Sequence, residues 1–268
     1  MGDVAMTVPV LRAFTSQYPD VKITMVSKGF FAPFFDDIPN VDFFAADTSG
    51  RHKGLIGLLR MFRDLKKLGI DAVADLHNVL RSKIIRRHFA FIGKKTAHLD
   101  KARAEKKALT RAENKIFKPL KPVTERHAEV FAMLGFPIDL SQPKFPPKQK
   151  MDDAVLAVAG EKTEKWIGIA PFAQHESKVY PEDLMQEVID SLAETGHKIF
   201  LFGAGQTETQ LLGTFASNHQ NVIVVAGKII FRQELQLISN LDVMLSMDSG
   251  NAHIAAMYGV PTVTLWGA

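Results

Sequence analysis

The stretch from Val243 to Trp266 reads VMLSMDSGNAHIAAMYGVPTVTLW and contains two short apolar runs with a helix-like segment between them. The runs Val243–Ser246 and Thr262–Trp266 are rich in apolar and β-branched residues and are bounded by turn residues, which is typical of buried strands. The segment Asn251–Tyr258 between them is predicted as a helix. Two strands joined through a helix indicate a parallel pair, because parallel neighbours need a crossover connection.

The same alternation extends upstream. Three further strands are predicted at Trp166–Ala170, Lys198–Phe202 and Val222–Val225, and three further helices at Pro181–Thr195, Thr207–Ala216 and Arg232–Ser239. Five strands, each separated from the next by a helix, predict a doubly wound parallel sheet. Such sheets bind ligands at the carboxyl ends of their strands.

The first half of the chain is also predicted to be α/β. Strands are expected at Val21–Val26, Val41–Ala45 and Ile70–Leu76, and helices at Leu55–Leu65, from about Val79, weakly over Lys101–Lys118, and at Thr124–Leu134 with Thr124 as N-cap. Residues 137–153 contain four prolines and little periodicity. We predict a linker there, between a Rossmann-like domain over residues 1–150 and a second one over 151–268; a long surface loop within one domain is the alternative.

The composition excludes several classes of protein. The chain has no cysteine, which excludes disulfides and thiolate zinc sites. Its nine histidines show no metal-binding spacing, so no metal site is predicted. There is no P-loop and no G-x-S-x-G elbow. No apolar run is long enough to span a bilayer and no signal sequence precedes the first helix, so a cytoplasmic protein is expected.

The charge is distributed unevenly. The formal net charge is +4, but residues 81–126 contain fifteen Lys/Arg and only four Asp/Glu. This basic block suggests an anionic partner, such as phosphate groups, a membrane surface or nucleic acid, and a solvated helix face is the alternative. It contains no nucleic-acid recognition motif and no interleaved aromatic residues, so nucleic acid is not the expected partner.

The turn after Val243–Ser246 is a candidate phosphate site. Gly250 allows the backbone to approach a ligand closely, and the N–H groups at the start of the following helix favour phosphate oxygens. Ser249 adds a hydroxyl donor, and His253 lies one turn into the helix. A carboxylate does not itself bind a diphosphate, so Asp248 is expected to cap the helix or to orient its donors. An ordinary capped helix is the alternative.

Two further loops carry candidate chemistry. Lys178 follows the strand Trp166–Ala170, where a lysine can neutralise a leaving diphosphate as a point charge; solvent exposure is the alternative. Asp3 follows Gly2 before a predicted helix, where it can serve as an N-cap or as the base that accepts a hydroxyl proton. The Phe202–Gln206 segment (FGAGQ) is only a weak dinucleotide fingerprint and indicates a tight turn.

Taken in this order, the motifs resemble those of the bacterial ADP-heptose:lipopolysaccharide heptosyltransferases, glycosyltransferase family 9. The resemblance lies in Gly2-Asp3-Val4 with Thr7-x-Pro9, Asp75-Leu76-His77, Lys178-x-x-Pro181, and Met247-Asp248-Ser249-Gly250-x-x-His253 followed by Gly259-Val260-Pro261-Thr262. It implies a GT-B fold, with two Rossmann-like domains whose parallel sheets face each other across a cleft. Members of the family begin with a strand and continue past the last strand seen here. We expect this chain to lack both the N-terminal strand and the C-terminal segment.

The resemblance also implies a function. The expected reaction is inverting, metal-independent transfer of a sugar, heptose from ADP-heptose, onto a lipopolysaccharide core or lipid A-type acceptor. Asp3 would be the catalytic base, and the residues that bind the donor would be Lys178, Asp248, Ser249, Gly250 and His253. Lys228–Phe231 would lie near the nucleotide base, and Thr207 or Glu208 near the ribose. The basic block would supply the acceptor-binding residues Arg81, Lys94, Lys95, Arg103, Lys106, Lys107 and Arg111.

No cofactor is expected besides the nucleotide-sugar donor, and the expected partner is a phosphorylated glycolipid at the membrane surface. The protein would then lie in the cytoplasm, with peripheral attachment to the inner face of the cytoplasmic membrane as an option. Two alternatives stay open. One is a non-catalytic nucleotide-sugar-binding protein, and the other is a sugar-nucleotide epimerase of the same fold, which would need a second acid/base and no acceptor surface.

Overall fold

The computed structural model describes residues 1–267, which divide into two compact units. The N-terminal unit is Met6–Lys144, and the C-terminal unit combines Met1–Ala5 with the chain from Phe145 onward. The division at residue 144 falls inside the segment 137–153 for which a linker was predicted. The segment Met1–Ala5 was predicted to belong to the N-terminal domain. It belongs instead to the C-terminal unit, because it forms a short helix that packs on α11 there.

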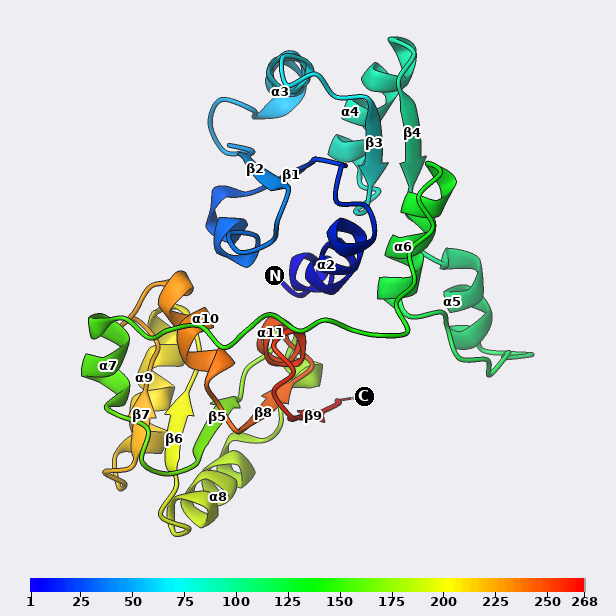
Figure 1. The fold of residues 1–268 in the computed structure, drawn as a ribbon. Helices are drawn as coiled ribbons and strands as arrows, with labels where there is room; N and C mark the ends of the chain where they lie inside the picture. Colours follow the sequence, from blue (N-terminus) through cyan, green and yellow to red (C-terminus); the bar gives the residue numbers. More distant parts are fainter. Residues whose placement is uncertain (268) are drawn as a thin grey trace. The chain divides into compact units, whose positions relative to one another are not determined.

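A five-stranded parallel sheet forms the centre of the C-terminal unit (Figure 1). Its strand order is β7-β6-β5-β8-β9. The strands are β5 (Trp166–Ala170), β6 (Lys198–Leu201), β7 (Val222–Val224), β8 (Val243–Met247) and β9 (Thr262–Leu265), and the helices are α1 (Gly2–Ala5), α7 (Asp153–Ala159), η2 (Glu176–Lys178), α8 (Glu182–Ala193), α9 (Gly205–Ala216), α10 (Phe231–Ser239) and α11 (Gly250–Met257). The doubly wound parallel sheet predicted from the sequence is confirmed.

The buried core of the C-terminal unit explains why its alternating strands and helices form a doubly wound sheet. All five residues of β5 are buried, as a central strand covered on both faces requires. The apolar stripe of α8, with Met185 and Ile189, packs on Ile169 and Ile199 of the sheet. The crossover helices therefore bury the faces that their periodicity predicts.

The N-terminal unit contains two separate parallel strand pairs, β1–β2 and β3–β4. Its elements are α2 (Val8–Gln17), β1 (Ile23–Ser27), η1 (Gly29–Phe34), β2 (Val41–Ala45), α3 (Gly54–Lys66), β3 (Ala72–Asp75), α4 (Leu80–Phe91), β4 (Lys95–His98), α5 (Arg103–Thr110) and α6 (Val123–Met133). The α/β expectation for this half is confirmed, although β4 was not predicted.

Three local predictions need correction. Pro122, not Thr124, is the N-cap of α6, because proline's fixed φ suits the residue that leads into the first turn. The helix predicted over Lys101–Lys118 ends at Thr110, since the following residues bury no apolar face. The end of the predicted linker is helical, because Asp152 accepts a hydrogen bond from the Val155 amide and so starts α7.

Helix α3 is fixed to the loop before it by a close backbone approach at Gly57. A Cβ added at Gly57 would lie 2.2 Å from the carbonyl carbon of His52, whose backbone cannot move aside as a flexible side chain could. We therefore expect Gly57→Ala to destabilise the protein by about 1–3 kcal/mol, as overpacking of a rigid site does. Urea or thermal unfolding followed by circular dichroism measures the effect.

Gly213 in α9 provides the matched control. A Cβ at Gly213 meets no described atom within 4 Å, so Gly213→Ala should raise stability by about 0.5–1 kcal/mol through helix propensity alone. Equal and favourable shifts for the two alanine variants would contradict the close packing of α3 on the His52 loop.

Candidate functional site

The candidate site lies at the carboxyl edge of the C-terminal sheet, where the strand order reverses. Strands β5 and β8 are hydrogen-bonded neighbours with Ala170 opposite Ser246, although many residues separate them in the chain. The chain leaves β5 toward β6 on one side and later returns to β8 on the other. Doubly wound sheets bind ligands at such a switch point, because the two connections diverge there and leave the edge open.

Lys178 and Asp248 meet at this point. Lys178 ends η2 in the loop after β5, and its Nζ forms an ion pair with the Asp248 carboxylate directly after β8. The backbone amide of Tyr180 also lies 3.3 Å from the Met247 sulfur, which holds the loop against the end of β8. Both side chains remain partly exposed, at 38% for Lys178 and 18% for Asp248, so a ligand can still reach them.

The expectation that Asp248 caps the helix is wrong. Ser249, not Asp248, occupies the N-cap position of α11, and no side chain caps the first turn. The Ser249 hydroxyl instead lies 3.0 Å from that of buried Ser246. The first N–H groups of α11, starting at Gly250, therefore face a place where an anion can supply the acceptor that the helix itself does not provide.

Helix α1 packs on the first turns of α11. A Cβ at Gly2 would lie 2.5 Å from Cδ2 of the His253 ring, and one at Gly250 would lie 2.6 Å from the Met1 side chain. Both contacts depend on the absence of a side chain. Asp3 lies in the first turn of α1 and not at its N-cap, so the alternative role as an N-cap is not observed. The structure thus brings the segment of Asp3 and the turn around Gly250 together within one unit.

The neighbouring loops add one contact that the sequence left open. The Glu208 carboxylate accepts a hydrogen bond of 2.7 Å from the Ala204 amide, in the turn after β6. Gly205 has a φ of +81°, which confirms the tight turn predicted there. Lys228–Phe231 follow β7 at the same edge of the sheet. The sequence did not predict the packing of Met1 on Gly250, because no local pattern indicates this long-range contact.

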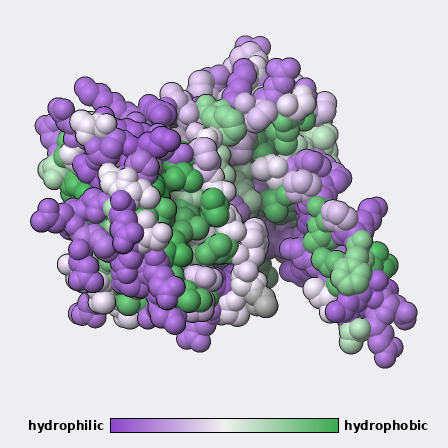
Figure 2. All heavy atoms as spheres, turned by 90° about the horizontal axis from the view of Figure 1, so that it is seen from below, coloured by the Kyte–Doolittle hydropathy of each residue, from purple (hydrophilic) through white to green (hydrophobic). Residues whose placement is uncertain are grey.

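The predicted acceptor residues lie on several elements of the N-terminal unit. Arg103, Lys106 and Lys107 are on α5, which has no buried residue, and Arg111 follows it. Figure 2 shows hydrophilic and hydrophobic side chains together on this projecting segment. Ile116 and Phe117, which follow α5 in the chain, are exposed.

The other three predicted acceptor residues lie outside α5. They are Arg81 in the first turn of α4, Lys94 beside β4 and Lys95 within β4. Lys94 forms an ion pair of 3.2 Å with Asp71, so its charge is partly compensated. The nearby Asp75 of the Asp75-Leu76-His77 motif is buried and accepts hydrogen bonds from the amides of His77 and Asn78. It therefore shapes the turn after β3 and does not face solvent.

The described residues contain neither a cluster of metal ligands nor a membrane-spanning helix. Over residues 1–267, no three or more His, Asp or Glu side chains are grouped as a bound metal ion requires. Within the same range, no helix is long and apolar enough to cross a membrane.

Comparisons with known proteins agree with this architecture. Residues 58–268 match the model of glycosyltransferase family 9 (heptosyltransferase). Lipopolysaccharide heptosyltransferase 3 of Escherichia coli is 22% identical over 100% of this chain and 81% of its own length. Lipopolysaccharide core heptosyltransferase OpsX of Haemophilus influenzae is 24% identical over 99% of this chain and 76% of its own length.

Solved structures show the same fold. A family 9 glycosyltransferase from Veillonella parvula superposes with a TM-score of 0.77 at 21% identity, covering 100% of this chain and 78% of that one. The E. coli heptosyltransferase WaaC with ADP-2-deoxy-2-fluoro heptose gives a TM-score of 0.71 at 20% identity, covering 98% and 85%. Because the family model spans most of the chain and the fold agrees, the protein belongs to glycosyltransferase family 9, the heptosyltransferase family, and is a glycosyltransferase of the GT-B type.

Proposed function

We propose that the protein transfers heptose from ADP-heptose to a phosphorylated lipopolysaccharide core acceptor, with inversion at the anomeric carbon and without a metal ion. The observation that carries this proposal is the convergence of Lys178, the Asp248–Gly250 turn and the Asp3 segment at the switch point of one sheet. The names of the relatives, lipopolysaccharide heptosyltransferases, support the choice of donor and acceptor.

The chemistry of the leaving group indicates which residues bind the donor. Departure of a nucleoside diphosphate builds up negative charge on its oxygens, which fixed donors and a cation stabilise. The first amides of α11, the Ser249 hydroxyl and Lys178 supply them without any metal. Lys178 forms an ion pair with Asp248, so a diphosphate bound here would replace or share that carboxylate as the partner of the ammonium group.

The chemistry of the acceptor indicates the roles of Asp3 and of the cations on α5. Its hydroxyl must lose a proton while it attacks the anomeric carbon from the face opposite the diphosphate, and Asp3 accepts this proton. The exposed cations of α5 bind the phosphates of the acceptor as charge-assisted hydrogen-bond donors. Arg103, Lys106 and Lys107 lie at i, i+3 and i+4 and so share one face of the helix.

A thermal-shift titration tests the donor. Only a ligand that binds the native state raises the apparent stability, and a concentration of 100 times its Kd adds about 2.7 kcal/mol. We expect ADP and ADP-heptose to raise the melting temperature, whereas GDP and UDP at equal concentration leave it nearly unchanged. A larger shift with UDP than with ADP would contradict the choice of nucleotide.

A turnover assay tests the reaction. ADP-heptose and a phosphorylated core acceptor should give ADP and a product of inverted anomeric configuration, at a rate that EDTA does not change. An epimerase of the same fold is the second candidate; the structure of a putative UDP-N-acetylglucosamine 2-epimerase from Listeria monocytogenes superposes with a TM-score of 0.54 at 11% identity and so shares the fold alone. An epimerase would convert its nucleotide sugar without any acceptor, and a non-catalytic binding protein would bind ADP-heptose without consuming it.

A further inference from the structure

The solvent face of α3 combines two kinds of exposed side chain. Leu55, Ile56 and Leu59 in its first half are 72%, 69% and 41% exposed, which is unusual for neighbouring aliphatic residues on one helix. The second half of α3 and its C-cap present four exposed cations, which are Arg60, Arg63, Lys66 and Lys67. At 3.6 residues per turn, all seven positions fall within an arc of roughly 140°, so they form one continuous surface, which we call the α3 surface.

The opposite side of the helix explains why this face stays outside. Leu58, Met61 and Leu65 are buried in a cluster with Ile85 and Phe89 of α4. Helix α3 is therefore held in place by its own apolar stripe. The aliphatic residues of the α3 surface contribute nothing to that core, and their exposure calls for another explanation.

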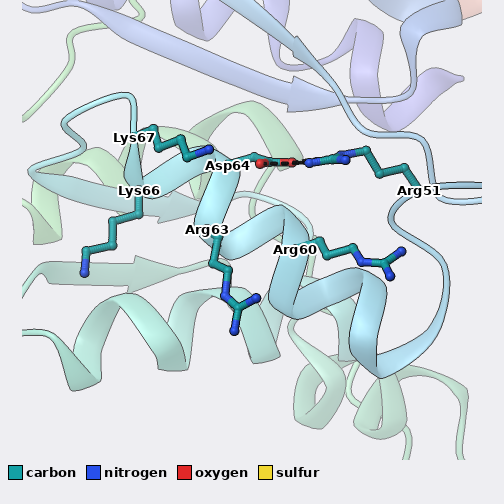
Figure 3. Close-up of a pocket in the computed structure, with 6 residues that line it drawn as sticks. All are labelled: Arg51, Arg60, Arg63, Asp64, Lys66 and Lys67. Carbon is teal, nitrogen blue, oxygen red and sulfur yellow. Dashed lines mark hydrogen bonds and ion pairs between the residues drawn. The ribbon is translucent and has the colours of Figure 1, made fainter.

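The charges of the α3 surface are not neutralised locally. The cations border an open depression whose lining is Arg51, Arg60, Arg63, Asp64, Lys66 and Lys67 (Figure 3). Its single carboxylate, Asp64, accepts hydrogen bonds of 2.8 to 3.1 Å from Arg51. That hydrogen bond lowers the pKa of Asp64, so the Asp64 charge is already matched by Arg51. Lys67 acts on Asp64 only at longer range, and among the described residues Asp64 forms its ion pairs with Arg51 and His52 and not with the other four lining cations.

We infer that the α3 surface docks the protein onto an anionic lipid bilayer, with Leu55, Ile56 and Leu59 inserted at the headgroup boundary and the four cations on lipid phosphates. Interfacial helices combine an aliphatic contact with Lys and Arg in this way, and their long stems let the charged ends reach the headgroups. A soluble phosphate or a nucleic acid would not account for the aliphatic half. A second copy of this chain would bring like charges together.

The inference goes beyond the proposed transfer reaction and does not use its residues. It places a membrane contact on α3, apart from the α5 cations assigned to the acceptor. A docked enzyme would meet a membrane-bound acceptor in two dimensions, with its substrate concentrated at the surface to which the enzyme is bound.

Vesicle flotation with the full chain tests the inference. Vesicles contain phosphatidylcholine alone or with 30% phosphatidylglycerol, and neither donor nor acceptor is present. We expect binding to the anionic vesicles only, weakened by 0.5 M NaCl because salt screens the headgroup attraction. Replacement of Arg60, Arg63, Lys66 and Lys67 by Gln should reduce the partition coefficient at least tenfold, and so should Leu55→Ser with Ile56→Ser.

A charge-matched variant separates docking by α3 from a general charge effect. Replacement of the exposed residues Lys22, Lys28, Lys150 and Lys165 by Gln removes the same number of positive charges from positions outside α3 and outside the residues assigned to donor and acceptor, and this variant should still float with the anionic vesicles. An equal loss in both four-residue variants, or equal binding to neutral vesicles, would overturn the inference. All variants should keep the melting temperature of the parent, because the replaced side chains are exposed. Failure of the transfer assay with intact flotation would contradict the proposed function alone.

Discussion

Asp3→Asn is expected to reduce kcat for sugar transfer by about a thousandfold while the Kd for ADP changes less than about twofold. A positioned general base contributes about 10²–10⁴ to a rate, and asparagine keeps the size and hydrogen bonding of aspartate without its ability to accept a proton. The donor side should be unaffected, because the proposed diphosphate ligands are Lys178 and the start of α11. Single-turnover kinetics and ADP titration by calorimetry measure the two quantities separately.

Asp20→Asn is the matched control, since Asp20 is an exposed carboxylate outside the candidate site. It should leave both quantities unchanged. Equal losses of rate and ADP affinity in Asp3→Asn would instead place Asp3 on the donor side. A lowered melting temperature would indicate that Asp3 matters for the packing of α1 on α11. In that case Asp3→Glu should restore stability but not the full rate, because its carboxylate is displaced by one methylene from the position of the base.

The fold of the C-terminal unit could be predicted because its five strands are short, largely apolar runs and a helix separates each strand from the next. The strands β5 and β8 lie at the predicted positions to within a residue. Strand β4 could not be found in this way, because its sequence KTAH is half polar. It is a strand because β3 aligns with it, with Ala72 opposite Lys95 and Asp75 opposite His98. Such pairing is a long-range property, and it overrides weak local propensity.

The candidate site shows the same limit. The sequence identified Lys178 and Asp248 separately, from their places after two strands. Their ion pair follows from the adjacency of β5 and β8, which a single sequence does not display. It also explains why the helix-capping role expected of Asp248 is wrong, because the carboxylate is engaged by Lys178. The contact of Gly2 with His253 joins the two ends of the chain and has no local signal at all.

Lys178→Ala is expected to lower ADP affinity about 10–100-fold and kcat/KM by about a thousandfold. A charge-assisted hydrogen bond contributes about 1.5–3 kcal/mol to binding, and each 1.4 kcal/mol is a factor of ten. The larger effect on kcat/KM follows because the charge on the diphosphate increases as the bond to the sugar breaks. Calorimetric titration with ADP and initial rates with ADP-heptose measure the two effects. Unchanged ADP affinity would remove Lys178 from the donor site.

The ion pair with Asp248 makes the assignment of Lys178 testable in a second way. If the carboxylate acts on the donor through Lys178, Asp248→Asn frees the ammonium group and should tighten ADP binding severalfold in the parent chain, but not in Lys178→Ala. A double-mutant cycle measures this coupling directly. Tightening of the same size in both backgrounds would mean that Asp248 repels the diphosphate by itself. Non-additive effects would instead show that Asp248 acts on the donor through Lys178, so that the affinity for the diphosphate depends on how firmly Asp248 holds the lysine.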